Sequence, residues 1–336
     1  MTEQPRPASD RPLRIGVLGA ARITPMALIA PARRVAEVEV VAVAARDRAR
    51  AEKFAARQRI AKVHASYADL IADPDVDAIY NPLPNSHHCE WTIRALEAGK
   101  HVLCEKPLAS NAEEARQMAE AADRTGRILM EAFHWRYHPI AERARSLLRE
   151  GRVGKIERIE VAFCIPLWSP GNIRYRLDLA GGAAMDLGAY TVNMLRYFGE
   201  AEPVVVSARA RLARAGVDRF MRAEFAYADG RSGGMTCSLF SASVLRLSLR
   251  VTGASGRLSL FNPIAPQIYH SLTLENRDGR TRERLAAEPT YTGQLRAFVH
   301  SVQTGERPPS DAWDGVANMA VIDSIYRHAG LAPRGT

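Results

Sequence analysis

A carboxylate, an ammonium and a proline end a short apolar segment of the chain. The segment is "HVLC", and Glu105, Lys106 and Pro107 follow it directly. Of the 46 basic residues only five are lysines, and Lys106 is the one that does not look like an ordinary surface residue. If the segment is a buried parallel strand, its carboxyl end faces the crevice where open α/β sheets bind ligands. We therefore expect Lys106 to meet a ligand, Glu105 to fix its position or the local geometry, and Pro107 to rigidify the turn, with a cis bond as one means.

A second candidate site is the turn in "GVLGAARITP". The dinucleotide fingerprint Gly-x-Gly-x-x-Gly lets the backbone approach a pyrophosphate at a helix N-terminus. Gly19 takes its first position, but Ala21 and Thr24 stand at the second and third. The turn alone fits a tight strand-to-helix connection equally well, and the strand and helix patterns around it favour a dinucleotide. We expect cofactor contacts from Gly19, Ala21, Arg22 and Ile23.

The end of the second expected strand bears on the choice between NAD and NADP. An acidic residue there would bind the ribose hydroxyls of NAD. This chain has Ala45 in that place and Arg46 next. A guanidinium suits a 2′-phosphate by charge and by bidentate geometry, whereas Asp47 is expected to cap the following helix. The sequence therefore favours NADP, with NAD as the alternative.

Strand and helix patterns alternate through the first 130 residues. Apolar, β-branched segments predict strands at 13–19, 38–45, 77–83, 101–105 and 126–132. Helix starts are expected at Thr24, an N-cap followed by Pro25, and at Ser110, which would form a capping box with Glu113. This alternation predicts a doubly wound parallel sheet, a Rossmann domain, over 12–134.

The pattern changes after about residue 135. Helices are expected at 139–150, after "GGAAMDLG", and near 292–304 and 314–328. Strand-like segments without intervening helices fill much of the remainder, which predicts a large, mostly antiparallel open sheet. We expect an α/β protein whose second, α+β domain spans 135–336, with residues 1–11 as a disordered leader.

Composition excludes several classes of protein. Hydrophobic content of 47% and charge of 25% are typical of a soluble globular protein, and no apolar run approaches the roughly 20 residues of a membrane span. The four cysteines show no metal or disulfide spacing, which favours reduced thiols and a cytoplasmic protein. The charge of +9 comes from scattered arginines, so no nucleic-acid partner is expected. His87 and His88 are adjacent and point to different faces, so we expect no metal site.

Several motifs occur together and in order. They are "NPLPNSHHCEWTIRALEAGKHVLCEKP", "FHWRYHP" and "GGAAMDLGAY". With these motifs the chain resembles the Gfo/Idh/MocA oxidoreductase family over nearly its whole length. It is most similar to the branch of D-xylose 1-dehydrogenase and trans-1,2-dihydrobenzene-1,2-diol dehydrogenase.

The resemblance implies roles for three residues. In the family the lysine of Glu-Lys-Pro reaches the hydroxyl of the reacting carbon and the nicotinamide ribose, a role that falls on Lys106. The commoner second motif is an Asp followed four residues later by His, whereas here Asp186 is followed by Tyr190, as in the branch where a tyrosine donates or accepts the proton. Free tyrosine has a pKa near 10, and a neighbouring Lys106 ammonium would favour the phenolate. Asp186, one helical turn earlier, would orient Lys106 or a substrate hydroxyl, and a purely structural Tyr190 is the alternative.

The remaining expected contacts come from loops. Cofactor contacts are expected from Leu83, Asn85, His88 and Glu105 as well as from Lys106. Asn172, Arg174 and Tyr175 precede the second motif and are expected to select the substrate. Arg136 is expected to contact cofactor or substrate, or else to form an interdomain salt bridge. Two glycines, 181 and 182, would let the backbone pass close to a ligand.

We expect an NADP-dependent oxidoreductase that transfers hydride between nicotinamide and a carbinol carbon of a sugar, polyol or cyclic diol. One alternative is a glycoside-cleaving enzyme that holds NAD tightly and oxidises the sugar transiently. Another is a non-catalytic NADP(H)-binding sensor, which the retained Lys106 disfavours. Because large apolar surfaces are rarely left exposed, the open sheet face predicts a homodimer or homotetramer.

Overall fold

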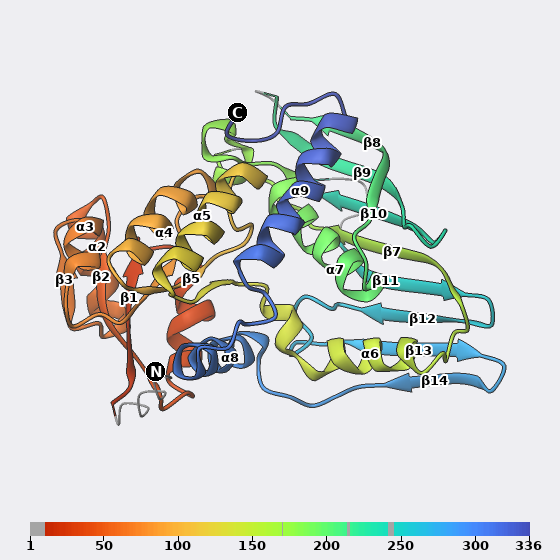
Figure 1. Cartoon of the computed structure of the whole chain (residues 1–336), viewed down its shortest axis with the longest axis horizontal. Coiled ribbons are helices and arrows are strands. Elements are labelled where there is room, and N and C mark those ends of the chain that lie inside the picture. Colours follow the sequence, from red (N-terminus) through yellow and green to blue (C-terminus); the bar gives the residue numbers. More distant parts are fainter. Residues whose placement is uncertain (1–10, 170, 214–215, 241–244) are drawn as a thin grey trace, which may run out of the picture.

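Two β-sheets side by side form the framework of the molecule (Figure 1). The computed structural model describes residues 11–169, 171–213, 216–240 and 245–336. The expected leader, apart from its last residue, lies outside these ranges. Both the parallel first sheet and the mostly antiparallel second sheet confirm the predicted α/β fold class.

The first sheet has six strands in the order β3-β2-β1-β4-β5-β6. All its neighbouring pairs are parallel. The strands are β1 (Leu13–Leu18), β2 (Val38–Ala44), β3 (Lys62–His64), β4 (Ala78–Asn81), β5 (His101–Cys104) and β6 (Leu129–Glu131). The helices are α1 (Ala30–Ala32), α2 (Arg48–Gln58), α3 (Tyr67–Ala72), α4 (His88–Glu97) and α5 (Ala112–Thr125). Five strands match the prediction, whereas β3, three residues with no apolar run, was not expected.

One of the predicted helix starts is confirmed and one is wrong. Asp47 caps α2, since its side chain accepts a hydrogen bond from the Arg50 amide. Thr24 is not a cap: its backbone is already helical, with φ −52° and ψ −42°, and its side chain makes no capping hydrogen bond. The helix continues from there as a π-turn over Pro25–Ile29.

The predicted capping box before α5 is displaced by one residue. Asn111, not Ser110, is the N-cap and accepts from the Glu114 amide. The Glu114 carboxylate in turn accepts from the Ser110 amide. Asparagine caps as well as serine does, and the glutamate at 114 rather than Glu113 lies within reach of the loop.

The second sheet has eight strands in the order β14-β13-β12-β11-β7-β10-β9-β8. Only the β7–β10 pair is parallel. The strands are β7 (Ile156–Cys164), β8 (Val204–Leu212), β9 (Asp218–Ala226), β10 (Ser232–Ser238), β11 (Arg246–Gly253), β12 (Gly256–Phe261), β13 (Ser271–Asn276) and β14 (Gly279–Glu283). The polar edge hairpin β13–β14 was not predicted.

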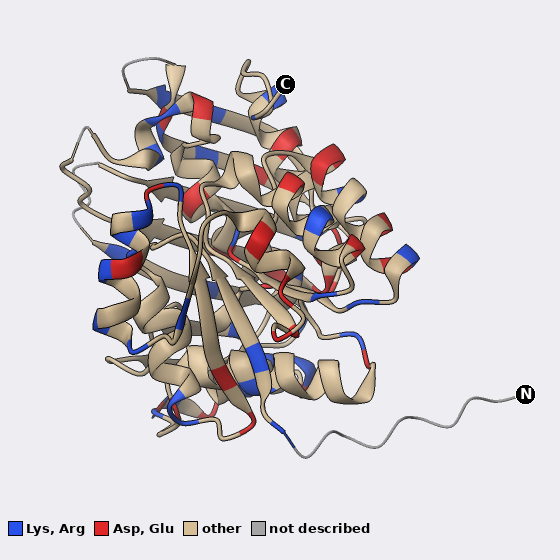
Figure 2. Cartoon of the chain, turned by 90° about the vertical axis from the view of Figure 1, so that its left-hand side faces the viewer, with Lys and Arg blue, Asp and Glu red and all other residues tan. Residues whose placement is uncertain are grey.

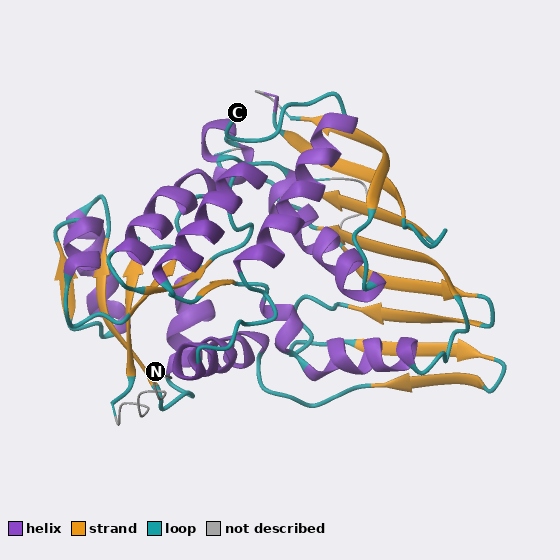
Figure 3. Cartoon of the chain, in the orientation of Figure 1, coloured by secondary structure: helices purple, strands orange, loops and turns teal. Residues whose placement is uncertain are grey.

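Helices cover one face of this second sheet (Figure 3). They are α6 (Pro139–Arg149), α7 (Ala189–Gly199) and α9 (Ala312–His328), and α7 continues a π-turn at Ala184–Gly188. Short 3₁₀ helices lie at Asn85–His87, His134–Tyr137, Ile173–Tyr175 and Leu177–Leu179.

The last two helices join the two sheets. Helix α8 (Thr290–Thr304) returns to the first sheet, where Leu295 and Phe298 belong to the same buried cluster as Ile15 and Val17. Helix α9 packs against both α5 and α7. The predicted division near residue 135 therefore separates the sheets, but the end of the chain contacts both.

Charged residues of both signs are interspersed over the surface (Figure 2). None of the helices among the described residues has the length and apolar character that crossing a bilayer requires. The four cysteines are free thiols, three of them buried.

Candidate active site

Lys106 connects the end of β5 to the π-turn that precedes α7. It follows β5, and the Lys106–Pro107 peptide bond is cis. Its ammonium donates to the backbone oxygen of Asp186 at 2.9 Å and lies 3.1 Å from the carboxylate Oδ1. The same ammonium lies over the ring of Tyr190, 4.6 Å from its centre. The carboxyl edge of the parallel sheet thus brings together the three residues of the expected catalytic group.

Asp186 is held between two cations. Arg174 Nε lies 2.5 Å from Oδ2, while Lys106 faces Oδ1. Burial alone would raise the pKa of Asp186, but Lys106 and Arg174 outweigh it and lower this pKa to about 2. Asp186 is therefore a permanent anion that fixes the positions of both cations.

The π-turn changes how Asp186 and Tyr190 relate. A regular α-helix would place residues four apart on one face, but Asp186 lies inside the π-turn Ala184–Gly188, where hydrogen bonds span five residues. A second π-turn, Pro25–Ile29, follows the Gly19 loop. Such turns often occur at functional sites, and here each one adjoins a predicted site.

Tyr190 differs from expectation in its ionisation. Its hydroxyl lies 3.0 Å from Nε2 of His134, whereas Lys106 contacts the ring face. Burial raises the pKa of Tyr190 well above its usual value, and Tyr291 and Glu105 add to this. The expected shift of Tyr190 toward the phenolate by a neighbouring Lys106 is therefore not found, because burial dominates and the ammonium does not face the oxygen.

Glu105 precedes Lys106 and is hydrogen-bonded to the neighbouring strand β4. Its Oε1 accepts from the hydroxyl of Tyr80, a fully buried residue of β4, at 2.7 Å. Burial raises the pKa of Glu105, and the Tyr80 hydrogen bond and Lys106 oppose this rise. Glu105 thus anchors the strand end that presents Lys106.

The Gly19 loop has the conformation that a dinucleotide turn needs. Gly19 has φ +83°, and a Cβ there would lie 3.1 Å from the Leu83 side chain. Arg22 is exposed, Ala21 and Ile23 are half-buried, and the guanidinium of Arg50 donates to the Ala20 oxygen at 2.9 Å. The sequence offered no signal for Arg50, which the first turn of α2 brings to this loop.

A pocket of about 500 Å³ lies next to this loop. Its lining residues are Ala45, Arg46, Ala65, Ser66, Tyr67, Leu83, Pro84, His87, Glu90 and Trp91. Tyr67 and Trp91 pack edge to face with ring centres 5.0 Å apart. Aromatic rings beside an exposed guanidinium suit a planar base and an attached phosphate, so the residues present fit the adenosine end of a dinucleotide. Only Arg46 and Leu83 of this set were predicted.

Two predicted cofactor residues connect loops through hydrogen bonds. Asn85 donates to the Ala180 oxygen at 2.9 Å, across the two domains. The ring nitrogens of buried His88 lie 2.9 Å from the Pro107 oxygen and 2.7 Å from the Leu83 oxygen. Burial lowers the pKa of His88 to about 4. Neutral His88 can donate to one of these two oxygens at a time, and its ring lies between the Leu83 loop and the Lys106–Pro107 turn.

Three of the predicted substrate residues do not face Lys106 directly. Arg136 forms a 2.6 Å ion pair with Asp314 of α9. Both residues lie in the predicted second domain, 135–336, so this salt bridge is within that domain and is not the expected interdomain one. Asn172 caps a short helix by accepting from the Arg174 amide at 3.1 Å, and the Tyr175 hydroxyl donates to a backbone oxygen, that of Leu167. Only Arg174 reaches the predicted catalytic group.

Close contacts within the chain require both glycines of the pair. Gly182 has φ +144°, and a Cβ there would lie 2.2 Å from the Asp218 carboxylate. A Cβ on Gly181 would lie 2.6 Å from the Arg174 oxygen. The expected close approach is thus to neighbouring backbone and to Asp218. Among the described residues, no three His, Cys, Asp or Glu side chains cluster as metal ligands would.

Two family models match the chain. One, described as an oxidoreductase family with an NAD-binding Rossmann fold, matches residues 13–133, and the Gfo/Idh/MocA C-terminal domain matches residues 141–259. The D-xylose 1-dehydrogenase (NADP(+)) 2 of Haloferax volcanii is 35% identical, over 94% of this chain and 97% of its own length. The chain belongs to the Gfo/Idh/MocA family.

Other members of the family are named for different substrates and reactions. The trans-1,2-dihydrobenzene-1,2-diol dehydrogenase of Bos taurus is 36% identical over 68% of this chain and 67% of its own length. A 3-ketoreductase from Actinomadura kijaniata, solved with NADP and TDP-benzene, has a TM-score of 0.89 at 31% identity, with 95% of this chain and 98% of its own covered. The expected family and enzyme class, a dinucleotide-dependent oxidoreductase, are confirmed.

Proposed function

We propose that this protein is an NADP-dependent oxidoreductase of a sugar, polyol or cyclic diol. The observation that carries this proposal is the position of Lys106 Nζ, at the carboxyl end of β5 between the Asp186 carboxylate and the Tyr190 ring. An ammonium held there can bind and polarise one oxygen of a ligand. The D-xylose and dihydrodiol relatives, both named for substrates with hydroxyl-bearing carbons, support this substrate class.

Each residue of the proposed catalytic group has a distinct task. The bound dinucleotide would accept or supply the hydride. Lys106 would hold the reacting oxygen, and Asp186 would hold Lys106 through its 3.1 Å contact. Tyr190 would exchange the hydroxyl proton. Arg174, which pairs with the other oxygen of Asp186, would contact a substrate hydroxyl.

Arg46 supports the choice of NADP. It is exposed, lines the pocket of about 500 Å³ and lies beyond β2, where NAD-binding domains present an acid. In Arg46→Ala, we expect KM for NADP to rise about 10- to 100-fold with KM for NAD little changed. Arg48→Ala is a matched control, because Arg48 pairs with Glu52 on the exposed face of α2. Equal changes for both cofactors would contradict the assignment.

A second substrate class has support from two relatives. The Actinomadura kijaniata 3-ketoreductase bears a nucleotide-linked ligand, and the dTDP-3,4-didehydro-2,6-dideoxy-alpha-D-glucose 3-reductase of that organism is 33% identical to this chain. The second candidate function is therefore reduction of a keto group on a nucleotide-bound sugar. It uses the same Lys106 and Tyr190 and differs in substrate.

One assay tests both candidates. NADPH absorbance is followed with aldoses, inositols and cyclic diols in the oxidative direction and with a nucleotide-linked keto sugar in the reductive direction. We expect turnover with a member of one set, and its loss in Lys106→Ala and in Tyr190→Phe. Cofactor binding without turnover on either set would favour the glycoside-cleaving or sensor alternative.

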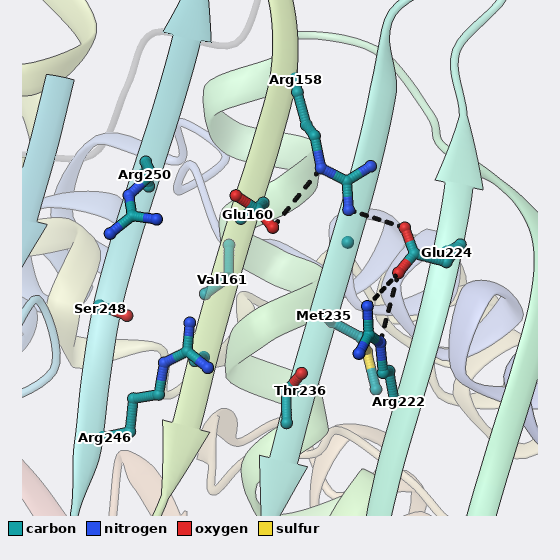
Figure 4. A pocket seen from close by; sticks show the side chains of 12 residues that line it. Arg158, Glu160, Val161, Arg222, Glu224, Met235, Thr236, Arg246, Ser248 and Arg250 are labelled. Atoms are coloured by element: carbon teal, nitrogen blue, oxygen red, sulfur yellow. Dashed lines mark hydrogen bonds and ion pairs between the residues drawn. The ribbon is translucent and has the colours of Figure 1, made fainter. Parts of the chain in front are cut away.

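We also propose that two copies of the chain associate through the open face of the second sheet. Figure 4 shows that this face is not the apolar surface that the sequence suggested but carries charges of both signs. Arg158 pairs with Glu224 at 2.7 Å, whereas Arg246 and Arg250 form no ion pair within the described part of the chain. A two-fold axis would bring such a mixed face against itself, base to acid. Light scattering on the wild type and on Arg250→Glu tests this, with a shift toward monomer expected in the variant, and a monomeric wild type would contradict it.

The free thiols support a cytoplasmic location. Fractionation of the source cells would test it.

A further inference from the structure

His134 is held on three sides next to Tyr190. It begins the short helix after β6 and is 4% exposed. Its Nε2 lies 3.0 Å from the Tyr190 hydroxyl, and its Nδ1 lies 2.8 Å from the hydroxyl of Thr290. Tyr291 stacks on the imidazole with ring centres 4.0 Å apart. The ring can therefore neither rotate nor exchange partners without disturbing α8.

The chemistry of the two hydroxyls sets the direction of these hydrogen bonds. A phenol is far more acidic than an aliphatic alcohol, so Tyr190 is the better donor and Thr290 the better acceptor. Burial and the Lys106 charge lower the pKa of His134 to about 3, which keeps the imidazole neutral. A neutral imidazole accepts at one nitrogen and donates at the other. Tyr190 thus donates to Nε2, and the Nδ1 proton goes to Thr290.

We propose that His134 is a positioning residue for Tyr190, accepting its hydroxyl proton so that the phenol oxygen can act as a base toward the substrate hydroxyl. The inference rests on the proposed function of the same site. With its O–H bond directed at His134, the Tyr190 oxygen presents lone pairs to a ligand bound by Lys106. The Tyr190 proton moves to His134 as the substrate proton arrives, so neither a phenolate nor an imidazolium, which burial makes unfavourable, has to form beforehand.

The proton transfer balances in atoms and charge. In the oxidative direction the substrate O–H bond breaks and an O–H bond forms on Tyr190, while the former Tyr190 proton bonds to Nε2 of His134. The C–H electron pair leaves the carbinol carbon as hydride, and the carbon–oxygen double bond forms. A bound dinucleotide would lose one positive charge on taking up this hydride and His134 would gain one, so the net charge of the site would not change. After product release the proton returns through Tyr190 to water, and the reductive direction is the reverse.

Four charged groups of the described residues act on the pair formed by Tyr190 and His134. Lys106 faces the Tyr190 ring, Glu105 and Asp186 raise the pKa of Tyr190, and Arg174 lowers it. Around His134, Lys106 is the one charged group that shifts its pKa. Since Asp186 stays ionised with a pKa of about 2, it does not titrate near neutral pH. Because His134 is neutral and Tyr190 is protonated in the free enzyme, neither has to titrate before the transfer begins.

The hydrogen-bond direction can be measured without any substrate. The nitrogen NMR shifts of His134 in the whole protein, assigned with the His134→Gln variant, report which ring nitrogen bears the proton. We expect the Nδ1-protonated tautomer at neutral pH. The Nε2-protonated tautomer would overturn the proposal, because His134 would then donate to Tyr190.

Kinetics separate positioning from mere packing. In His134→Phe, which keeps an aromatic ring against Tyr291, we expect kcat to fall about 100-fold with KM changed less than about threefold. In this variant kcat/KM for oxidation should gain a rising limb above neutral pH that the wild type lacks, because Tyr190 must then ionise by itself. His134→Gln, whose amide oxygen can accept the hydrogen bond but cannot take up the proton, should leave kcat about as low as in His134→Phe.

A matched control is available on the same short helix. Tyr137→Phe also removes a buried hydrogen bond, that between Tyr137 and Ser310 at 2.8 Å, but does not touch Tyr190. Its pH profile should equal that of the wild type. If His134→Phe keeps the wild-type profile while Lys106→Ala is inactive, the inference fails and the proposed function stands. If the wild type turns over no substrate, the proposed function fails. The tautomer of His134 that the NMR shifts report still decides the direction of the His134–Tyr190 hydrogen bond.

Discussion

Two carboxylates near the cis Lys106–Pro107 turn, partly buried Asp186 and fully buried Glu131, have opposite ionisation. Asp186 contacts two cations, at 3.1 Å and 2.5 Å, and its pKa is lowered to about 2. Glu131, fully buried at the end of β6, accepts from the Leu108 amide at 2.8 Å, and its other oxygen has no partner. Burial, with Asp314, raises the pKa of Glu131 to about 8.

The difference shows that burial does not decide the charge of a carboxylate, whereas partner geometry does. The two arginines nearest Glu131 are taken by another acid: Asp314 pairs with Arg136 at 2.6 Å and with Arg196 at 2.9 Å. Glu131 is thus left to carry a proton near neutral pH. The anion at Asp186 organises the proposed chemistry, while neutral Glu131 supports the turn from behind.

The largest expected effect comes from removing the cation that distinguishes the two sites. In Lys106→Ala we expect kcat to fall about 1,000-fold, because the reacting oxygen loses its polarising charge. Turnover per folded enzyme, on whichever substrate the wild type accepts, measures this. Lys100→Ala is the control, since Lys100 donates to the backbone oxygens of Asp73 and Val76 away from the site. A Lys106→Ala enzyme with a tenth or more of the wild-type kcat would remove Lys106 from the mechanism.

Glu131→Gln should remove the pH dependence of stability that the buried Glu131 carboxyl causes. Between about pH 5 and pH 8 the folded protein keeps a proton on Glu131 that the unfolded chain has lost, so wild-type stability falls as pH rises. One pKa unit corresponds to about 1.4 kcal/mol, and we expect the variant to gain about 3 kcal/mol on the wild type across that range. Denaturant unfolding at several pH values measures this, with exposed Glu157→Gln as control. Parallel pH curves for wild type and Glu131→Gln would mean that Glu131 is ionised.

Much of the fold and part of this site could be predicted from the sequence. Strand-end position and motif together indicated Lys106, and the motif indicated Asp186 and Tyr190, because these signals lie within short segments. The other five strands of the first sheet, which lie in apolar segments, were clear for the same reason. Three-residue β3 and the polar β13–β14 hairpin lack the apolar periodicity on which such predictions depend.

The environments of these residues could not be predicted, since they join distant parts of the chain. His134 reaches Tyr190 and Thr290 only because α8 returns to the first sheet. Arg136 is drawn away by Asp314 of α9, which no local pattern near residue 136 indicates. The ionisation of Tyr190 follows from burial, which exceeds the effect of the neighbouring ammonium.

Asp186→Asn should remove the charge that distinguishes Asp186 from neutral Glu131. The folded-state pKa of Asp186 lies below its ordinary value, so its stabilisation is present above about pH 4 and is lost as pH falls toward about 2. We expect the variant to lose about 2 kcal/mol at neutral pH, and the gap to close in acid. Urea unfolding near pH 6 and near pH 3 tests the sign. A gap that stays constant with pH would indicate lost packing rather than lost charge.

The smallest effect is expected for the outer cation of the pair. The Arg174 side chain is 39% exposed, so solvent screens its bond to Asp186, and Lys106 still holds the carboxylate in Arg174→Gln. We expect a loss of stability of about 1 kcal/mol or less. Arg176→Gln is the control, because Arg176 pairs with Asp178 on the exposed loop. If Arg174 also contacts substrate, KM should rise about tenfold with kcat nearly unchanged, as expected for an interaction made equally in ground and transition states. An unchanged KM with lowered kcat would instead mean that Arg174 acts only through Asp186.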